Sequence, residues 1–206
     1  MNKEQTITGV IRGTGACVPE RILDNKEIAG FVDTSDEWIR ERTGVRRRRI
    51  AEKETTVSMA CEAGRQAVEE AGILPGEIDM ILVATGSPDQ IFPCTACQVQ
   101  EALGADGAVG FDLNAACSGF LFAYNTAQAY IASGIYRTVL VIGSESISRL
   151  VDWTDRGTCI LFGDGAGAVL LQAAEGRTYR PIAHSDGSGG EALTGPGVRN
   201  RIRSID

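Results

Sequence analysis

The stretch DLNAACSGFLFAYNTAQAYIASG, residues 112–134, contains a change from an extended run to a helix around one cysteine, Cys117. After this cysteine, large and small apolar residues recur every three or four positions, which is the period of an α-helix. The residues nearest Cys117 are small, two alanines before it and Ser118-Gly119 after it. The stretch therefore predicts a strand, a tight turn that holds the cysteine, and a long helix.

The same alternation of strand and helix extends outward in both directions. The runs IDMILVAT (78–85) and RTVLVIGSE (137–145) each contain an unbroken apolar segment, MILVA and VLVI, which is typical of strands buried on both faces. A helix is predicted over 56–71, where alanines form one stripe, and another over 94–103. Further strands are predicted at 7–13 and 108–114, and the segment 157–172 as two strands joined by a glycine turn. This order predicts an α/β layered fold with a mixed, mostly parallel sheet.

Composition and charge bound the possible functions. The 206 residues are 43% hydrophobic and 23% charged, with a formal net charge of −7. Such a chain is long enough for a well-buried core, and its acidity argues against non-specific nucleic-acid binding. The run Arg46–Arg49, with Arg40 and Arg42 close by, is the local exception. We interpret it as a solvated face, the alternative being a contact with a phosphate or an acidic partner.

Targeting signals are not evident in the sequence. Residues 1–15 lack the apolar core of a secretory signal, and no run of about 18 apolar residues could span a membrane. Six cysteines without an export signal are best interpreted as reduced thiols. We therefore expect a cytoplasmic protein that does not contact the membrane.

Cys117 has two interpretations from the residues alone. A cysteine in apolar surroundings is commonly a small buried hydrophobic residue. At the start of a helix, however, unpaired N–H groups and the positive end of the helix dipole favour the thiolate. Small neighbours would also leave room for a substrate. Both interpretations, buried side chain and nucleophile, stay open at this point.

Two other motifs suggest cofactor chemistry less strongly. Cys94 and Cys97 form a CxxC motif, but no second CxxC or histidine pair accompanies them, so we expect no zinc or other metal. We interpret the motif as a packed helix start rather than a redox pair. The glycines of FGDGAGA (162–168) have the spacing GxGxG and precede an apolar run, not a helix. A nicotinamide cofactor is therefore not expected.

An exposed tryptophan with nearby arginines offers a third candidate site. Trp38 lies in DTSDEWIRERTG, where Ser35 is a predicted N-cap and two acidic residues follow it. Arg156 lies in DWTDRGT. Such a pair is ordinarily surface packing, but it can also be a stacking platform for a purine ring, with arginines for phosphates.

Together these segments closely resemble the β-ketoacyl-acyl-carrier-protein synthase III family. The matching stretches, in family order, are DTSDEWIRERTGVRRR, FPCTACQVQ, DLNAACSGF, WTDRGT, FGDGAGA and HSDGSGG. ACSGF alone is shared with other condensing enzymes, whereas its combination with DTSDEWI and TDRGT is highly specific. The resemblance covers nearly the whole chain.

The resemblance implies a thiolase-like fold of two similar halves and a role for each matching residue. Cys117 resembles the nucleophile that accepts an acyl group from acyl-CoA. Trp38 resembles the residue that stacks on the CoA adenine opposite Arg156. The remaining implied positions are Thr34 and Arg42 near the adenine, Leu161 and Phe162 along the pantetheine tunnel, and Phe92, which crosses a dimer interface, with Ile147 at the acyl pocket.

The implied activity initiates fatty-acid synthesis. Acyl-CoA loads Cys117, and decarboxylative condensation with malonyl-acyl-carrier protein follows in a homodimer that needs no cofactor beyond the CoA thioester. The length and branching of the starter acyl group stay open.

One departure from the family pattern concerns the second half of the fold. The family histidine and asparagine lie in segments that resemble HQAN and GNTS, and neither occurs in these 206 residues. The sole histidine, His184, lies in a different family stretch. We therefore expect residues 1–175 to form the N-terminal half and 176–206 to begin the connection to a half absent from this chain. The alternative function is a truncated chain or half-domain that binds CoA or a partner and can be acylated but cannot condense.

Overall fold

A five-stranded mixed sheet forms the centre of the molecule, in the order β1-β7-β6-β4-β5. The structure is a computed structural model and describes residues 6–178 and 181–195. β4 pairs in parallel with both β5 and β6, while β7 pairs antiparallel with β6 and β1. The five strands are β1 (Thr6–Cys17), β4 (Met80–Ala84), β5 (Val109–Leu113), β6 (Thr138–Ser146) and β7 (Asp164–Gly176).

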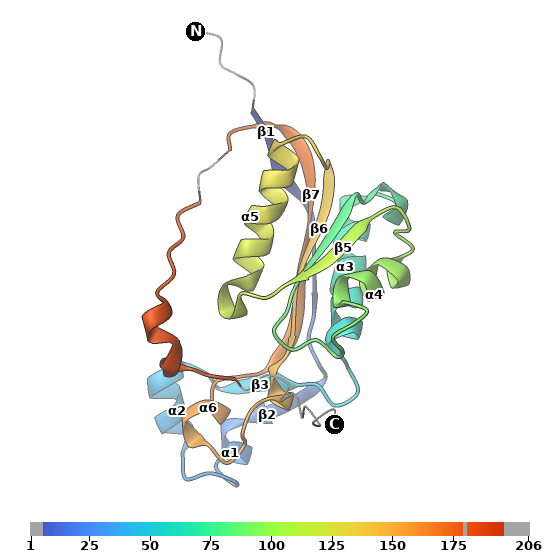
Figure 1. Cartoon of the computed structure of the whole chain (residues 1–206). Helices are drawn as coiled ribbons and strands as arrows, with labels where there is room; N and C mark the ends of the chain where they lie inside the picture. Colours follow the sequence, from blue (N-terminus) through green and yellow to red (C-terminus); the bar gives the residue numbers. More distant parts are fainter. Residues whose placement is uncertain (1–5, 179–180, 196–206) are drawn as a thin grey trace, which may run out of the picture.

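Helices cover the two faces of this sheet unequally (Figure 1). α3 (Thr56–Ala71) and α4 (Thr95–Leu103) lie on one face, and α5 (Gly119–Ala132) lies on the other. Each face has its own apolar core: alanines of α3 pack on Ile81 and Leu140, and alanines of α5 pack on Leu82 and Val141. The outer side of α5 keeps apolar residues at the surface, Leu121 being 54% exposed. The predicted α/β layered fold with a mixed sheet is confirmed.

A smaller layer lies beyond one end of the sheet. It contains the two-stranded sheet of β2 (Arg21–Asp24) and β3 (Arg47–Ile50), with the helices α1 (Asn25–Ile28), α2 (Asp36–Thr43) and α6 (Arg156–Cys159). A third apolar cluster holds the layer together around Ile28, Ile39 and Ile160. Short 3-10 turns complete the described chain: η1 (Pro75–Glu77), η2 (Ala116–Ser118), η3 (Ile147–Arg149) and η4 (Gly187–Ala192).

Close backbone approach fixes β1 against α3. An ideal Cβ added to Gly13 would lie 2.0 Å from the carbonyl oxygen of Ala67, so only glycine permits this spacing. The pairing of β1 with β7 shifts register between Ile11 and Gly13, at the same place.

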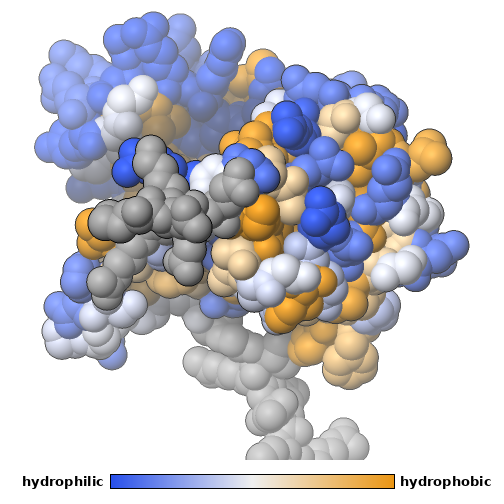
Figure 2. All heavy atoms as spheres, turned by 90° about the horizontal axis from the view of Figure 1, so that it is seen from above, coloured by the Kyte–Doolittle hydropathy of each residue, from blue (hydrophilic) through white to orange (hydrophobic). Residues whose placement is uncertain are grey.

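Seen from above, apolar side chains lie at the surface among hydrophilic ones (Figure 2).

Most elements predicted from the sequence are present, and one segment differs. The helix predicted over 56–71 has those bounds, and the strands and helices around Cys117 agree within a few residues. Ser35 caps α2 as expected, its hydroxyl accepting from the backbone N–H of Trp38 at 3.1 Å. The two strands predicted over 157–172 are wrong, because α6 occupies the start and β7 alone follows. The glycines and alanines at the start of β7 adopt an extended backbone, so the strand continues without a turn.

Among the described residues, no helix combines the length and apolar character needed to cross a bilayer.

Candidate active site at the carboxyl ends of the parallel strands

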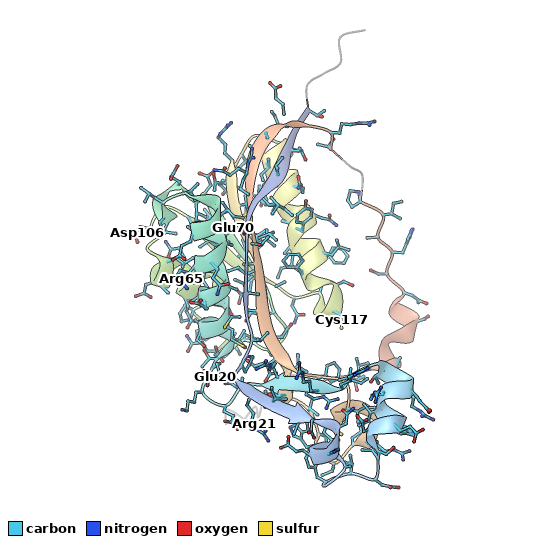
Figure 3. All side chains as sticks on the ribbon, turned by 180° about the vertical axis from the view of Figure 1, so that it is seen from behind. Glu20, Arg21, Arg65, Glu70, Asp106 and Cys117 are labelled. Atoms are coloured by element: carbon cyan, nitrogen blue, oxygen red, sulfur yellow. The ribbon has the colours of Figure 1, made fainter. Side chains whose placement is uncertain are left out.

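Cys117 lies directly before α5, at the end of the helix nearest the smaller layer (Figure 3). Its side chain is exposed, so the interpretation as a buried hydrophobic residue is wrong. The three parallel strands β5, β4 and β6 end beside this turn. In α/β sheets, ligands bind outside the carboxyl ends of the strands. The cysteine is therefore in the region of the fold where a substrate would be expected.

A strained turn presents the cysteine. Ala116 has a φ of 45°, the left-handed region that non-glycine residues seldom adopt and that costs about 1 kcal/mol or more. The side-chain oxygen of Asn114 accepts a hydrogen bond from the Ala116 N–H at 3.2 Å. A Cβ added to Gly119 would lie 3.2 Å from the Cβ of Ala84, so glycine lets α5 begin close to β4. Local residues thus hold the position of Cys117.

Glu145, at the end of β6, connects two of the strand ends. Its carboxylate accepts hydrogen bonds from the Gly86 N–H at 2.8 Å and from the hydroxyls of Thr85, at 3.4 Å, and Ser87. An ideal Cβ at Gly86 would lie 3.7 Å from both Glu145 Oε1 and Asn114 Oδ1. The ends of β4, β5 and β6 therefore meet in one polar cluster, which sequence patterns did not predict.

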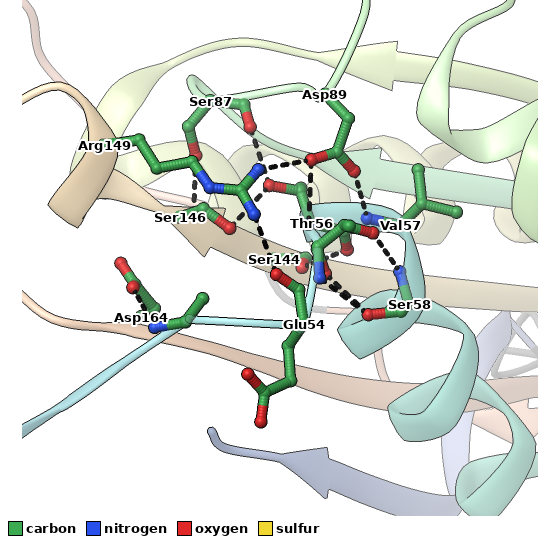
Figure 4. Close-up of polar contacts among 12 residues, drawn as sticks. Glu54, Thr56, Val57, Ser58, Ser87, Asp89, Ser144, Ser146, Arg149 and Asp164 are labelled. Atoms are coloured by element: carbon green, nitrogen blue, oxygen red, sulfur yellow. Dashed lines mark hydrogen bonds and ion pairs between the residues drawn. The ribbon is translucent and has the colours of Figure 1, made fainter. Parts of the chain in front are cut away.

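A second polar network fastens the loop after β4 to α3 (Figure 4). Asp89 accepts from the N–H groups of Thr56, at 3.3 Å, and Val57, at 2.8 Å, at the first turn of that helix. Arg149 donates to the Asp89 carboxylate and to the Glu54 carbonyl, each at 2.8 Å. A carboxylate at a helix N-terminus is favourable, and the arginine neutralises it. The network connects the loop that leads to Phe92 with the end of β6.

The predicted adenine site comes together at α2 and α6. The guanidinium carbon of Arg42 lies 4.2 Å from the centroid of the Trp38 ring, and that of Arg156 lies 4.8 Å away. Arg156 also donates to the Asp33 carbonyl at 3.1 Å. The Thr34 hydroxyl oxygen is buried and has no hydrogen-bond partner. Two cations on one indole ring and an unsatisfied hydroxyl are features that a nucleotide could use.

The residues predicted for the acyl pocket and for the pantetheine tunnel are exposed or half-buried in the single chain. Phe92 is 82% exposed, and Ile147 is half-buried at the end of β6. Leu161 is exposed and Phe162 half-buried in the segment between α6 and β7. One copy of the chain therefore does not enclose Phe92 in a pocket.

The arginine run divides between structural and exposed residues. Arg48 is buried, donates to the Asn25 side chain and the Ile160 carbonyl, and burial lowers its pKa. Arg49 is half-buried and donates to two backbone carbonyls. The interpretation as a solvated face is therefore wrong for these two and holds for Arg46 and Arg47.

His184 is exposed in the segment 181–195. In the described part of the chain, no group of three or more His, Cys, Asp or Glu side chains could hold a metal ion.

Asp164 is a buried carboxylate that fastens the smaller layer to the sheet. It accepts from the N–H groups of Ala51, at 2.7 Å, and Ser148, at 2.9 Å, and from the Ser148 hydroxyl at 2.6 Å. We expect Asp164→Asn to lower the free energy of unfolding by about 2–3 kcal/mol, because the amide cannot accept all three bonds. Urea unfolding measures this. The exposed Asp106→Asn is the control and should change stability little; equal effects would contradict the assignment.

Comparison with known proteins agrees with the fold and the motifs. Residues 111–188 match the family described as 3-oxoacyl-[acyl-carrier-protein] synthase III. A β-ketoacyl-[acyl-carrier-protein] synthase III of Erythrobacter litoralis is 52% identical over 188 residues, covering 88% of this chain and 59% of the relative. The corresponding protein of Clostridium acetobutylicum is 51% identical over 187 residues, with 90% and 58% covered. The chain thus spans about three fifths of the length of these relatives.

Solved structures give the same result. The crystal structure of 3-oxoacyl-[acyl-carrier-protein] synthase III from Aquifex aeolicus has a TM-score of 0.80 and 50% identity, covering 82% of this chain and 55% of that one. A priming β-ketosynthase of a polyketide pathway has a TM-score of 0.86 and 39% identity, covering 92% and 57%. The resemblance drawn from the sequence motifs is therefore confirmed over the part of these proteins that the chain spans.

Proposed function

We propose that this chain, a relative of the β-ketoacyl-acyl-carrier-protein synthase III enzymes, provides the acyl-accepting cysteine of an acyltransferase that initiates fatty-acid synthesis. The observation that carries the proposal is the exposed Cys117, held by a strained turn where three parallel strands end and α5 begins. The match to the synthase family over 111–188 includes this turn.

The first step is transfer of the acyl group to sulfur. The Cys117 thiolate attacks the thioester carbonyl of acyl-CoA, and the tetrahedral intermediate collapses with loss of CoA as its thiolate, which takes up a proton. Backbone N–H groups at the start of α5 stabilise the oxyanion, a large contribution in acyl transfer. The Cys117 N–H is the donor we propose from the family resemblance.

The CoA nucleotide binds on the smaller layer in this proposal. Its adenine stacks between Trp38 and Arg156, with Arg42 near the phosphates and the Thr34 hydroxyl as an additional hydrogen-bonding group. Leu161 and Phe162 line the path of the pantetheine arm toward Cys117. The guanidinium carbon of Arg156 lies 4.8 Å from the indole centroid, so its side chain must move away from the ring before adenine can enter between them, and its place beside Trp38 supports the assignment.

Arg42→Ala is expected to weaken CoA binding by roughly tenfold, because a cation near both the ring and the phosphates is lost. Arg42 is preferable to Trp38 as a test, since Trp38 packs on the apolar cluster of the smaller layer. Arg40→Ala is the matched control: the same helix carries it, and it pairs with Asp36 at 3.4 Å. Titration calorimetry with CoA measures the difference. Equal losses for both variants would indicate a general charge effect.

The second step and the assembly complete the proposal. Malonyl-acyl-carrier protein loses CO₂, and the resulting carbanion equivalent attacks the thioester carbonyl on Cys117. The carbon–sulfur bond breaks, which releases the Cys117 thiolate and gives β-ketoacyl-carrier protein. Phe92 crosses to the partner's acyl pocket in a homodimer, and Ile147 lines the pocket. The large exposure of Phe92 supports this role.

We also propose a cytoplasmic enzyme that requires no metal or added cofactor. Residues 1–175 correspond to its N-terminal half, with 176–206 beginning the connection to the second.

Two measurements on the same preparation test the proposal. Incubation with acetyl-CoA should add one acetyl mass to the protein and release free CoA. Subsequent addition of malonyl-acyl-carrier protein should release CO₂ when the second half of the fold, which carries the family histidine and asparagine, is present. Acylation without CO₂ release would favour the alternative of a chain that is loaded but cannot condense. That alternative finds no support in the names of the relatives, which are those of the synthase itself.

A further inference from the structure

Two cysteine sulfurs are in contact at the beginning of α4. Cys94 is the N-cap residue of this helix, and Cys97 lies in its first turn. Their sulfur atoms are 3.4 Å apart, a thiol–thiol hydrogen bond. A disulfide has a sulfur–sulfur distance of about 2.05 Å, so bond formation requires an approach of roughly 1.4 Å, within the reach of side-chain rotation. The packed helix start predicted from the sequence therefore also brings the two thiols together.

The two sulfurs differ in their access to solvent. Cys97 is exposed, whereas Cys94 is half-buried and packs on the core beneath α3 and α4. In the single chain, a reagent in solution can thus reach Cys97 first, while Cys94 lies beside it and can displace the reagent. A CxxC motif at the start of a helix is an arrangement that supports thiol–disulfide exchange between its two cysteines.

The surroundings of Cys97 keep it mostly as a thiol near neutral pH. The Asp112 carboxylate accepts from the N–H groups of Thr95 and Ala96, each at 2.8 Å, and so occupies the N-terminus of α4. The hydrogen bond with Cys94, partial burial and the charge of Asp112 together raise the pKa of Cys97. Exchange at this site should consequently become faster as the pH rises and the thiolate fraction increases.

We propose that Cys94 and Cys97 form a site of reversible oxidative modification, closing to a disulfide by exchange with a small disulfide such as oxidised glutathione. The Cys97 thiolate attacks one glutathione sulfur and releases the other glutathione as a thiol. The Cys94 thiolate then attacks Cys97 in the mixed disulfide and releases the second glutathione. The two cysteines lose two protons and two electrons, and the oxidised glutathione becomes two reduced glutathiones.

Peptide mapping separates this site from Cys117. The whole chain is incubated with oxidised glutathione, the remaining thiols are blocked with an alkylating agent in acid, and the protein is cleaved before its aspartates. The peptide 89–105 then contains Cys94 and Cys97 and no other cysteine, and the peptide 112–151 contains only Cys117. We expect peptide 89–105 to lose two hydrogens, to take up no alkylating agent, and to recover both thiols after reduction.

Single serine variants test the order of attack. Cys94→Ser should accumulate glutathione on Cys97, because the resolving thiol is absent. Cys97→Ser should take up glutathione on Cys94 at least about tenfold more slowly, because that sulfur is half-buried. Disulfide formation in the unmodified chain should accelerate between about pH 7 and about pH 9. Thermal unfolding of each variant checks that it is folded.

Three outcomes would overturn the proposal. The first is a peptide 89–105 that keeps two free thiols under conditions that fully modify Cys117. The second is a disulfide that joins either cysteine to a different part of the chain. The third is a Cys94→Ser variant that, although folded, carries no glutathione on Cys97. None of these results depends on whether Cys117 accepts an acyl group, so the test is independent of the proposed function.

Discussion

Replacement of Cys117 by alanine is expected to abolish acylation of the protein by acetyl-CoA and to lower the rate of acyl transfer on the order of 10⁴-fold or more. The covalent step requires the sulfur atom, and no neighbouring group can substitute for it as a thioester-forming nucleophile. The alanine removes one exposed side chain, so the free energy of unfolding should change little. Intact-protein mass spectrometry after incubation with acetyl-CoA measures the result directly.

Cys97→Ala is the matched control for this experiment. It too removes one exposed cysteine near the start of a helix, but α4 lies on the opposite face of the sheet from α5. This variant should be acylated as completely as the unmodified protein, with the acetyl group in peptide 112–151. An acetyl adduct that persists in Cys117→Ala, or that disappears in Cys97→Ala, would mean that the nucleophile has been assigned to the wrong residue.

Gly13→Ala is expected to lower the free energy of unfolding by roughly 3–5 kcal/mol. The added methyl group would lie 2.0 Å from the Ala67 carbonyl oxygen and 2.8 Å from the Ala71 nitrogen. These are backbone atoms of α3, which cannot rotate away as a side chain can. Either β1 or α3 must move, and both pack on the main core, so the cost exceeds that of ordinary overpacking. Chemical unfolding followed by circular dichroism measures it.

Gly107→Ala provides the comparison. A methyl group there meets no atom within 4 Å, and the residue lies in the exposed turn between α4 and β5. Its stability should stay within about 0.5 kcal/mol of the unmodified protein. If Gly13→Ala were as stable as Gly107→Ala, the close approach of β1 and α3 would not be a feature of the folded protein.

The parts of the fold that sequence could predict are those with a strong local signal. The helix over 56–71 combines a capping threonine, a stripe of alanines and Gly72, whose φ of 68° ends it. The strand β4 is a continuous apolar run, β6 begins with the apolar run VLVI after one threonine, and both strands are almost wholly buried. The prediction for 157–172 is wrong because α6 is only one turn long, and its signal, Asp155 capping the Gly157 N–H, is local and weak.

The candidate site was predictable only in part. Cys117, Trp38 and the arginines are distinctive residue types in distinctive motifs, and the structure brings Trp38 together with Arg42 and Arg156. The contacts of Glu145 and Asp164 depend on partners from strands and loops far away in sequence, so no local pattern indicates them. The contact between Cys94 and Cys97 has a sequence signal, the CxxC spacing, but the exposure of one sulfur and the burial of the other come only from tertiary packing.

The pairing of β1 with β7 has a consequence for the order of events during synthesis. Thr6 lies opposite Gly176, and Cys17 lies opposite Ala166, so β1 is synthesised long before β7, its partner in the described sheet. Until β7 has been synthesised, β1 lacks this sheet partner, and the face of α3 that covers β1 packs on an incomplete sheet. Contacts so distant in sequence slow folding and leave apolar surface open in the nascent chain. Chaperone binding should therefore persist until translation has passed β7.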